Sequence, residues 1–320
     1  MGKILADVTG AIGNTPIVQL SRLTADWGLD GTIFAKLEYL NPGFSKKDRI
    51  ALQIMTDAKA QGLLQPGQTV VELTSGNTGT GLAIVCSVLG HPFIAVMSQG
   101  NSPERADMMR ALGAEVVLVP QVSGGIPGHV SGADLALVEV EAQRLTAQRQ
   151  AYRVSQFTHP SNVIAHERHT AAEIWHQTAG CLDGFVDFAG TGGSFAGCAR
   201  GLKAYNNSIR CYLVEPAGAP VLSGAPVTDP SHAIQGGGYN MPLPLVDPDL
   251  VHGYVRVTDR EAKEAARRLA RTEGIFAGYS SGANLAAARK LLLGAEAGKR
   301  IVVLINDSGL KYLSTDLFRP

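Results

Sequence analysis

Short apolar segments alternate with longer amphipathic segments along most of the chain. The apolar segments predict strands buried on both faces, at Ile33–Leu37, Thr69–Leu73, Phe93–Met97, Glu115–Val119, Phe185–Ala189, Cys211–Glu215, Val255–Val257 and Ile301–Ile305. The longer segments have helical periodicity, at Arg49–Gln61, Thr78–Leu89, Pro103–Leu112, Asp134–Ala147, Asn162–Gln177, Arg260–Glu273 and Gly282–Leu293. This alternation predicts an α/β protein with open, mostly parallel twisted sheets that carry helices on both faces.

The length and composition exclude several classes of protein. The 320 residues are 45% apolar and 18% charged, which is enough apolar sequence for a sizeable core. Lysine plus arginine (28) balance aspartate plus glutamate (28), so no basic excess favours nucleic-acid binding. The start lacks a signal-peptide pattern, and no apolar run reaches the roughly 20 residues of a membrane span. The composition predicts a soluble globular protein of a reducing compartment.

A glycine-rich loop, GTGGS at 190–194, follows the strand Phe185–Ala189 and precedes a helix. At a helix N-terminus the backbone N–H groups and the helix dipole favour a bound phosphate. A dinucleotide-binding loop fits less well because its third glycine would fall on Phe195, although Glu215 stands where such folds place a ribose-binding acid. The pattern therefore predicts a phosphate site, with a simple packing turn as the structural alternative.

Two further loops place polar side chains at helix starts. The loop TSGNTG at 74–79 follows the strand Thr69–Leu73 and suits a carboxylate, although ordinary helix capping explains the same residues. In the segment NPGFSKKDR at 41–49, a Pro-Gly turn leads to Lys46 and Lys47 at a helix start. The helix dipole disfavours a cation there, so such a lysine loses its proton more readily and suits imine chemistry. Two solvated surface lysines are the alternative.

These segments together resemble the cysteine synthase (O-acetylserine sulfhydrylase) and cystathionine β-synthase family of fold-type II pyridoxal-phosphate enzymes. The resemblance covers nearly the whole chain and also includes IGNTP (12–16), QF (156–157), VEPAG (214–218), IQG (234–236), EGI (273–275), GYSSGA (278–283), DSG (307–309) and YLST (312–315). It implies a two-lobed, tryptophan synthase β-like fold. Residues 1–45 and 158–320 would form the larger cofactor-phosphate-binding lobe, and residues 46–157 the smaller, mobile substrate lobe.

The resemblance also implies roles for individual residues. Lys47 would carry the pyridoxal 5′-phosphate and act as general base at the substrate Cα, Ser280 would face the pyridine nitrogen, and Asn77 would face the ring oxygen O3′. The cofactor phosphate would be held by Gly190, Thr191, Gly192, Gly193 and Ser194. The substrate would contact Thr74, Ser75, Gly76, Thr78, Gln156, Gly236 and Tyr239.

The implied reaction is β-replacement on O-acetylserine or O-phosphoserine through an α-aminoacrylate, with sulfide as the nucleophile and L-cysteine as the product. Because a neutral Ser280 hydroxyl leaves the pyridine ring a weak electron sink, loss of a β-substituent is favoured. The alternatives are replacement by an amine or another nucleophile to give a diaminopropionate-type or secondary-metabolite amino acid, elimination or dehydration alone, and a non-catalytic binding protein. The resemblance further implies a cytoplasmic homodimer that takes small molecules and binds neither nucleic acid nor membrane.

Several positions depart from the family pattern. Leu73 stands where proline is usual before TSGNTG, and Lys46 stands where the family has the valine of S-V-K. The residues GGYN at 237–240 replace the usual I-G-A-G, so Tyr239 lies in a loop that covers the substrate in the family. The loop Gln121–Gly132 is longer than typical and is predicted to be a mobile flap or linker. These departures leave the identity of the substrate and the nucleophile open.

One histidine-rich segment is a candidate metal site. His166, His169, Glu173 and His176 are spaced by three, four and three residues, which would place them on one face of a helix. Imidazoles and carboxylates bind zinc, but ligands from a single helix cannot easily surround a metal ion, so we expect a polar helix face and no metal. The cysteines are scattered without a CxxC pair, and we expect small buried side chains at Cys86, Cys181, Cys198 and Cys211.

Overall fold

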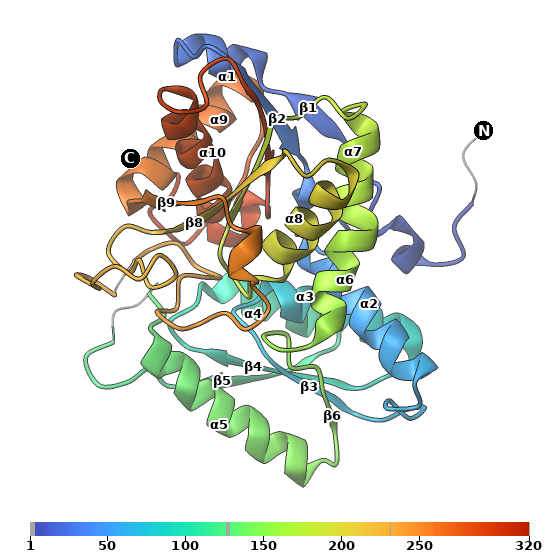
Figure 1. Ribbon diagram of the computed structural model, residues 1–320. Helices are drawn as coiled ribbons and strands as arrows, with labels where there is room; N and C mark the ends of the chain where they lie inside the picture. The colour runs from blue at the N-terminus through green and yellow to red at the C-terminus, as the bar shows by residue number, and fades with distance from the viewer. Residues whose placement is uncertain (1–3, 126–128, 231, 320) are drawn as a thin grey trace.

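The computed structural model describes residues 4–125, 129–230 and 232–319, which form two sheets surrounded by helices (Figure 1). The strands are β1 (Ile17–Gln19), β2 (Thr32–Lys36), β3 (Val70–Leu73), β4 (Phe93–Ser98), β5 (Glu115–Val119), β6 (Tyr152–Arg153), β7 (Gly184–Phe188), β8 (Arg210–Pro216), β9 (Gly253–Val257) and β10 (Arg300–Leu304). The helices are α1 (Ser21–Asp26), α2 (Lys47–Ala60), α3 (Asn77–Leu89), α4 (Pro103–Ala111), α5 (Gly132–Gln148), α6 (Pro160–Ala165), α7 (Ala172–Gln177), α8 (Gly193–Tyr205), α9 (Asp259–Glu273) and α10 (Tyr279–Leu292). None of these helices is long and apolar enough to cross a membrane.

Two open sheets organise the fold. Among the described residues, the larger sheet has six strands in the order β1-β2-β10-β7-β8-β9, and the smaller has four in the order β5-β4-β3-β6. The paired strands are parallel, apart from β1, which runs antiparallel to β2. The predicted α/β fold with mostly parallel sheets is therefore confirmed. The division into two lobes at 1–45 with 158–320 and at 46–157, and any closing motion, stay predictions.

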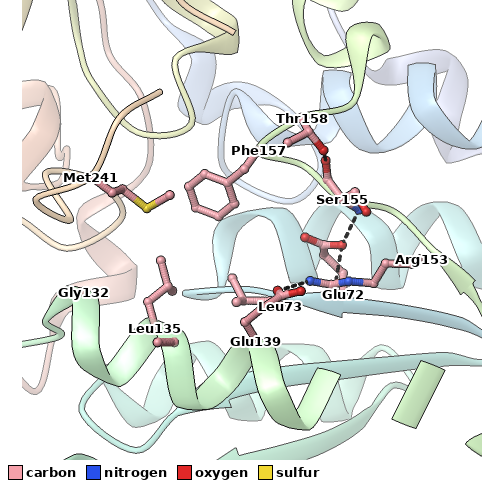
Figure 2. A pocket seen from close by; sticks show the side chains of 11 residues that line it. Glu72, Leu73, Gly132, Leu135, Glu139, Arg153, Ser155, Phe157, Thr158 and Met241 are labelled. Carbon is pink, nitrogen blue, oxygen red and sulfur yellow. Dashed lines mark hydrogen bonds and ion pairs between the residues drawn. The ribbon is translucent and has the colours of Figure 1, made fainter. Parts of the chain in front are cut away.

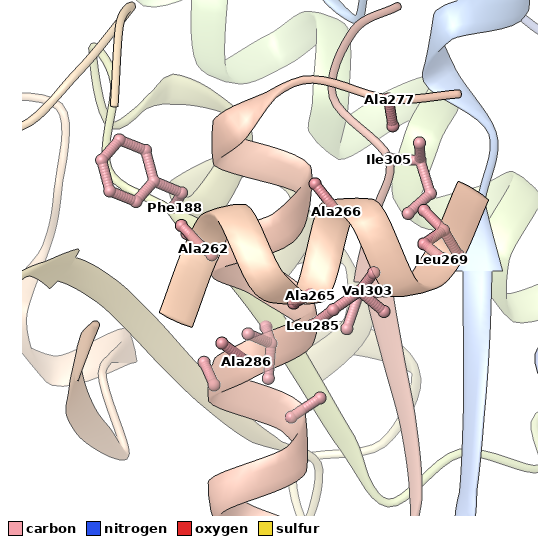
Figure 3. Packing of buried hydrophobic residues seen from close by; sticks show 14 of the residues in the cluster. Phe188, Ala262, Ala265, Ala266, Leu269, Ala277, Leu285, Ala286, Val303 and Ile305 are labelled. Carbon is pink, nitrogen blue, oxygen red and sulfur yellow. The ribbon is translucent and has the colours of Figure 1, made fainter. Parts of the chain in front are cut away.

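Helices cover both faces of the larger sheet. Neighbouring residues of β10 point to opposite sides: Val303 packs with α1, α9 and α10, whereas Val302 packs with α7 and α8. This alternation is what a strand with two buried faces requires. Figure 3 shows how closely α9 and α10 approach through alanines. A Cβ at Gly282 of α10 would lie 2.0 Å from the carbonyl oxygen of Ala262, so glycine permits this packing.

The smaller sheet is covered in the same way. Val70 on β3 packs with α2, α3 and α4, and its neighbour Val71 packs with α5. Figure 1 shows α2, α3 and α6 between the two sheets and α5 on the outer side of the smaller one. Loops that follow the carboxyl ends of β3 and β7 therefore approach each other between the sheets.

Most predicted elements agree with the structure to within a few residues, with four kinds of difference. β5 has its predicted range, but its predicted burial on both faces is wrong, because it is an edge strand and its residue Leu118 is 39% exposed. β1, β6 and α1 were not predicted, since two to six residues carry little periodicity. The predicted helix Asn162–Gln177 contains a π-helical turn at His166–Ala171 between α6 and α7. Cys181 is exposed, whereas the other cysteines are buried as predicted.

The predicted loop Gln121–Gly132 leads into α5. Its residues 126–128 lie outside the described residues. Ser131 and Asp134 form a reciprocal capping box at the start of α5: the Ser131 hydroxyl accepts from the Asp134 N–H, and the Asp134 carboxylate accepts from the Ser131 N–H. The mobility of this loop stays a prediction.

Candidate cofactor and substrate site

Loops from both sheets meet around one cavity. The loop 74–79 follows β3 and leads into α3, and the loop 189–192 follows β7 and leads into α8. Ligands of open α/β sheets bind outside the carboxyl ends of strands, where these loops lie. The cavity is lined by Lys47, Leu73, Thr74, Ser75, Asn77, Thr78, Arg105, Gln156, Phe157, Thr191, Gly236 and Tyr239. The fold thus brings together the predicted lysine, one residue of the predicted phosphate loop and most of the predicted substrate residues.

Lys47 enters this cavity as the first residue of α2. The preceding segment is held by β10, an inner strand of the larger sheet. Ser45 forms a β-bridge with Asp307, and the Lys46 N–H donates to the carbonyl oxygen of Asn306 at 2.9 Å. Residues 306 and 307 follow directly after β10, so the sheet determines where Lys47 stands.

The Lys47 amine is nearly buried. The residue is 8% exposed, and Nζ donates to Thr191 Oγ1 at 3.3 Å. Burial and, second, the neighbouring charge of Lys46 lower the pKa of Lys47 to about 7, while Asp187 opposes this shift. A lysine with such a pKa is substantially neutral at pH 7, and the neutral amine is the form that attacks a carbonyl carbon. The lowered pKa thus arises chiefly from burial, where the sequence pattern pointed to the helix dipole.

The loop after β7 forms a tight cradle at the start of α8. Gly192 has a φ of +85°, and a Cβ at Gly193 would lie 2.0 Å from Asn162 Oδ1. A Cβ at Gly190 would lie 3.9 Å from Lys47 Nζ. Glycine is therefore required here for packing, and it leaves backbone N–H groups accessible to a ligand that lies beside Lys47.

The cradle has the chemistry of a phosphate site. Among the described residues, no side chain caps the N-terminus of α8, so its first N–H groups and its dipole can meet an anion. Asn162, which is buried, donates from Nδ2 to Thr191 Oγ1 at 2.9 Å and orients that hydroxyl. The Ser194 side chain differs from expectation: its hydroxyl donates to Asp187 Oδ2 at 2.5 Å, which leaves the Ser194 backbone N–H as its group for a phosphate. The residues present therefore fit the phosphate end of pyridoxal phosphate.

The side chains of the loop 74–79 are paired across the cavity. Thr78 Oγ1 donates to Gln156 Oε1 at 2.6 Å, and the hydroxyl groups of Ser75 and Tyr239 are hydrogen-bonded to each other. Thr74 Oγ1 instead accepts from two backbone N–H groups of its own loop, each at 2.9 Å. Thr78, Gln156 and Ser75 thus present groups that can exchange partners for a carboxylate, while Thr74 holds the loop in shape.

Asn77 is held at both ends of its amide. Nδ2 donates to Asp307 Oδ2 at 2.8 Å, and Oδ1 accepts from Lys311 Nζ at 2.8 Å. Burial lowers the pKa of Lys311 to about 8. Gly76, also predicted as a substrate residue, is not part of the described cavity wall; its φ of +121° lets the loop turn into α3. Asn77 is therefore oriented rigidly in the wall of the cavity.

Ser280 is not among the residues that line this cavity. It lies in the first turn of α10, is 9% exposed, and accepts a hydrogen bond from Asn306 Nδ2 at 3.1 Å. Because the Asn306 carbonyl also holds the Lys46 N–H, Ser280 is two hydrogen bonds away from the segment that carries Lys47. Its contact with a pyridine nitrogen stays a prediction.

Arg105 is a wall residue that the sequence analysis did not assign to the site. Its side chain is completely buried, and Nη1 donates to the carbonyl oxygen of Ser75 at 2.8 Å. The guanidinium carbon also lies 4.7 Å from the centroid of the Tyr312 ring. Its sequence signal is weak, because the Glu104-Arg105 pair stands at the start of the predicted helix Pro103–Leu112 without a glycine-rich loop beside it. Leu73 and Phe157 were likewise not assigned, although both line the cavity.

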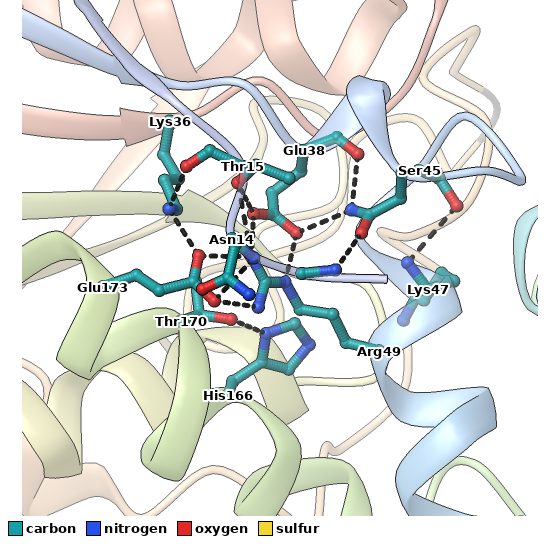
Figure 4. Close-up of polar contacts among 12 residues, drawn as sticks. Asn14, Thr15, Lys36, Glu38, Ser45, Lys47, Arg49, His166, Thr170 and Glu173 are labelled. Atoms are coloured by element: carbon teal, nitrogen blue, oxygen red, sulfur yellow. Dashed lines mark hydrogen bonds and ion pairs between the residues drawn. The ribbon is translucent and has the colours of Figure 1, made fainter. Parts of the chain in front are cut away.

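The candidate metal residues do not gather at one point. His166 is buried, whereas His169 and His176 are exposed, and Glu173 forms an ion pair with Arg49 at 2.7 Å (Figure 4). The expected shared helical face is wrong because the π-helical turn changes the spacing along this segment. Within the described ranges, no group of three or more His, Cys, Asp or Glu side chains could hold a metal ion. The ion pair instead anchors α2, and with it Lys47, to α7.

Known proteins resemble this chain over nearly its full length. It is 37% identical over 323 residues to the cystathionine beta-synthase of Apis mellifera, covering 98% of this chain and 61% of that protein, so it spans less than two thirds of this relative. It is 36% identical over 318 residues to a cysteine synthase of Staphylococcus aureus, covering 99% of this chain and 98% of that protein.

Solved structures give the same result. The crystal structure of an O-ureido-L-serine synthase matches with a TM-score of 0.88 and 36% identity, covering 99% of this chain and 96% of that one. An O-acetyl serine sulfhydrylase, isoform 3 from Entamoeba histolytica, matches with a TM-score of 0.90 and 34% identity, covering 99% and 92%. Residues 8–307 match the family described as pyridoxal-phosphate dependent enzyme. With its buried lysine beside a glycine cradle at a helix start, the chain belongs to this family of pyridoxal-phosphate-dependent enzymes.

Proposed function

We propose that this enzyme carries out β-replacement on an activated L-serine, O-acetyl-L-serine or O-phospho-L-serine, with sulfide as the nucleophile and L-cysteine as the product. The observation that carries the proposal is the position of the Lys47 amine, which has a pKa of about 7 and lies between the cradle 190–193 and the loop 74–79. Relatives named cysteine synthase and O-ureido-L-serine synthase support a product built on the serine skeleton.

In this proposal Lys47 and Ser280 have different roles at the cofactor. Bound pyridoxal phosphate supplies a ring that withdraws electrons from the substrate Cα. Lys47 holds the cofactor, takes the proton from Cα and returns it at the end of the reaction. Ser280 offers a neutral hydroxyl to the pyridine nitrogen, and a neutral partner does not keep that nitrogen protonated. With this neutral partner at Ser280, the electron withdrawal that the cofactor supplies would be weak, which would favour loss of a β-substituent.

The cavity wall orients the amino acid. Thr78 gives up its hydrogen bond to Gln156, Ser75 gives up its bond to Tyr239, and both hydroxyl groups donate to the substrate carboxylate. Gln156 meets the carboxylate with an Nε2–H, and Asn77 faces the ring oxygen of the cofactor. Because Asp307 and Lys311 fix the Asn77 amide, this contact is formed without further ordering of the side chain. Gly236 and Tyr239 line the same cavity and contact the substrate there.

Absorption spectroscopy with two lysine variants tests the proposal. We expect the purified protein to show a visible band of bound cofactor that changes on addition of O-acetylserine or O-phosphoserine but not of serine, and that is restored by sulfide with release of cysteine. Lys47→Ala is expected to lose the band, and Lys46→Ala to keep it. A protein that cannot be reconstituted with pyridoxal phosphate, or that loses the band with Lys46→Ala alone, would contradict the proposal.

The family resemblance leads us to propose a cytoplasmic homodimer as the working form. Light scattering on the purified holoenzyme should give twice the mass of one chain. A monomeric mass at full activity would exclude the dimer as a requirement for catalysis.

A further inference from the structure

A second cavity lies next to the Lys47 cavity. It has a volume of about 400 Å³ and lies between α5, β3, the segment 155–158 and Met241 (Figure 2). Leu73 and Phe157 line both cavities, so one pair of residues separates them. The volume is in the range of pockets that hold small organic ligands.

The wall of this second cavity is apolar on the side that faces the Lys47 cavity. Leu73 and Phe157 form this side, Leu135 and Met241 add further apolar wall, and Figure 2 shows the Met241 side chain directed at the Phe157 ring. The Phe157 ring also makes an edge contact with Tyr239, with centroids 6.3 Å apart. Side chains of this kind favour an apolar or aromatic body in the cavity.

The other end of the cavity is polar, and its charged side chains form ion pairs with one another. Arg153 Nη1 lies 3.2 Å from Glu72 Oε2, and Nη2 lies 2.6 Å from Glu139 Oε2 (Figure 2). Glu72 is completely buried and also accepts from the Ser155 N–H at 2.8 Å, which fixes the start of the segment 155–158. The Arg153 guanidinium here already pairs with the carboxylates of Glu72 and Glu139. A ligand with a carboxylate of its own would therefore compete with both for Arg153.

We propose that this cavity holds the apolar body of an organic nucleophile that the enzyme accepts besides sulfide, an uncharged thiol with a ring-sized apolar group such as benzyl mercaptan. The inference rests on the proposed β-replacement and adds to it a larger nucleophile that the same enzyme accepts besides sulfide. Sulfide has no body to fill such a cavity, whereas a ring-sized group fills it and directs its nucleophilic atom past Leu73 and Phe157. Because Phe157 lines both cavities, a rotation of its side chain would open one to the other.

The reaction balances with such a thiol. Its sulfur forms the new bond to Cβ of the serine skeleton, and the bond from Cβ to the ester oxygen breaks. The electron pair of that bond leaves with acetate or phosphate, and the thiol proton leaves with it. The Cα proton taken by Lys47 is returned, so the products are an S-substituted cysteine and the free acid.

The kinetic test compares benzyl mercaptan with sulfide in the holoenzyme. Ala136 lines the second cavity on α5, whereas Ala147 is an exposed residue of the same helix that does not. We expect Ala136→Trp to raise the KM for benzyl mercaptan by about tenfold or more while the sulfide reaction stays within about twofold. The matched control Ala147→Trp should change neither. Equal effects of Ala136→Trp on both nucleophiles, or no effect on benzyl mercaptan, would overturn the inference.

A binding measurement separates this inference from the proposed function. Benzyl alcohol has the same body without the thiol, and calorimetry on the holoenzyme should detect its binding, weakened about tenfold by Ala136→Trp and not by Ala147→Trp. Turnover with sulfide, but neither binding of benzyl alcohol nor turnover of benzyl mercaptan, would overturn the inference alone. Binding of benzyl alcohol without turnover by any nucleophile would overturn the proposed function and, with it, the role of the cavity as a nucleophile site.

Discussion

Lys46 and Asp187 form a buried ion pair, and the charges of both residues act on the pKa of the Lys47 amine. Lys46 Nζ lies 2.8 Å from Asp187 Oδ1 and 2.9 Å from Oδ2, although the two residues are 141 positions apart in the chain. Their side chains are 7% and 0% exposed. Asp187 also accepts from Ser194, so the pair connects the start of α2 with the glycine cradle. The charge at position 46, which departs from the family pattern, therefore has its own partner in the core.

This pair predicts a specific pattern of stabilities. Lys46→Val or Asp187→Val alone should lower the free energy of unfolding by about 3–5 kcal/mol, because each leaves a buried charge without its partner. The double variant should recover most of this loss, since a buried ion pair is often replaced by apolar side chains at little net cost. Urea denaturation at saturating pyridoxal phosphate measures the cycle. Additive losses in the double variant would show that the two charges do not interact.

The lowered pKa of Lys47 predicts how cofactor loading depends on pH. Lysine is neutral above its pKa, so the reactive fraction increases as the pH rises, and the loading rate of cofactor-free protein should increase with a midpoint at about pH 7. Lys46→Val should move this midpoint up, because a like charge is removed and Asp187 loses its partner. Asp187→Asn should move it down. Stopped-flow absorbance at a series of pH values measures the loading rate. Midpoints that shift in the same direction in both variants would contradict the electrostatic explanation.

Gly193→Ala should damage the cofactor site. The added Cβ would lie 2.0 Å from Asn162 Oδ1, and the buried Asn162 amide has little room to move because it also donates to the Gln156 carbonyl. We expect a loss of about 1–3 kcal/mol in stability together with weaker binding of pyridoxal phosphate. Gly294→Ala is the control, because its Cβ would lie 3.4 Å from the nearest atom, at ordinary contact distance. Thermal unfolding and titration with the cofactor measure both effects, and a Gly193→Ala protein with unchanged affinity would exclude the cradle as the phosphate site.

Thr78→Val should separate substrate binding from cofactor binding. Thr78 donates to Gln156 at 2.6 Å and lines the Lys47 cavity, so loss of the hydroxyl removes one partner of the substrate carboxylate. We expect the KM for the activated serine to rise about tenfold or more, as for the loss of a hydrogen bond to a charged group, with an unchanged cofactor band. Thr146→Val serves as control, since its hydroxyl donates to the Ala142 carbonyl of its own helix and, within the described part of the chain, does not line the Lys47 cavity. A cofactor band altered as strongly as the KM would place Thr78 at the cofactor instead.

The local sequence pattern was sufficient to predict the helices and strands that are long or that end at a glycine. Buried strands such as β4 and β7 show as nearly continuous apolar runs, apart from Asp187 in β7, because both their faces are covered. Gly90 and Gly274 end α3 and α9 in the left-handed conformation. The glycines at 190, 192 and 193 pointed to a phosphate cradle for the same reason, because the conformation of a loop depends mainly on residues that are adjacent in the chain. Edge strands such as β5 were misjudged, because burial depends on the neighbour that a strand lacks.

The sequence by itself thus determined the sheet type, the glycine cradle and the lysine segment, since each depends on residues that are adjacent in the chain. Tertiary structure alone decided which distant side chains meet. It paired Lys46 with Asp187, turned the Ser194 hydroxyl away from the cradle, brought Arg105 to the loop 74–79, and placed Leu73 and Phe157 between two cavities. The physical reason is that backbone conformation follows from local sterics and hydrogen bonding, whereas charge pairing, desolvation and cavity shape arise only when elements from different parts of the chain pack together.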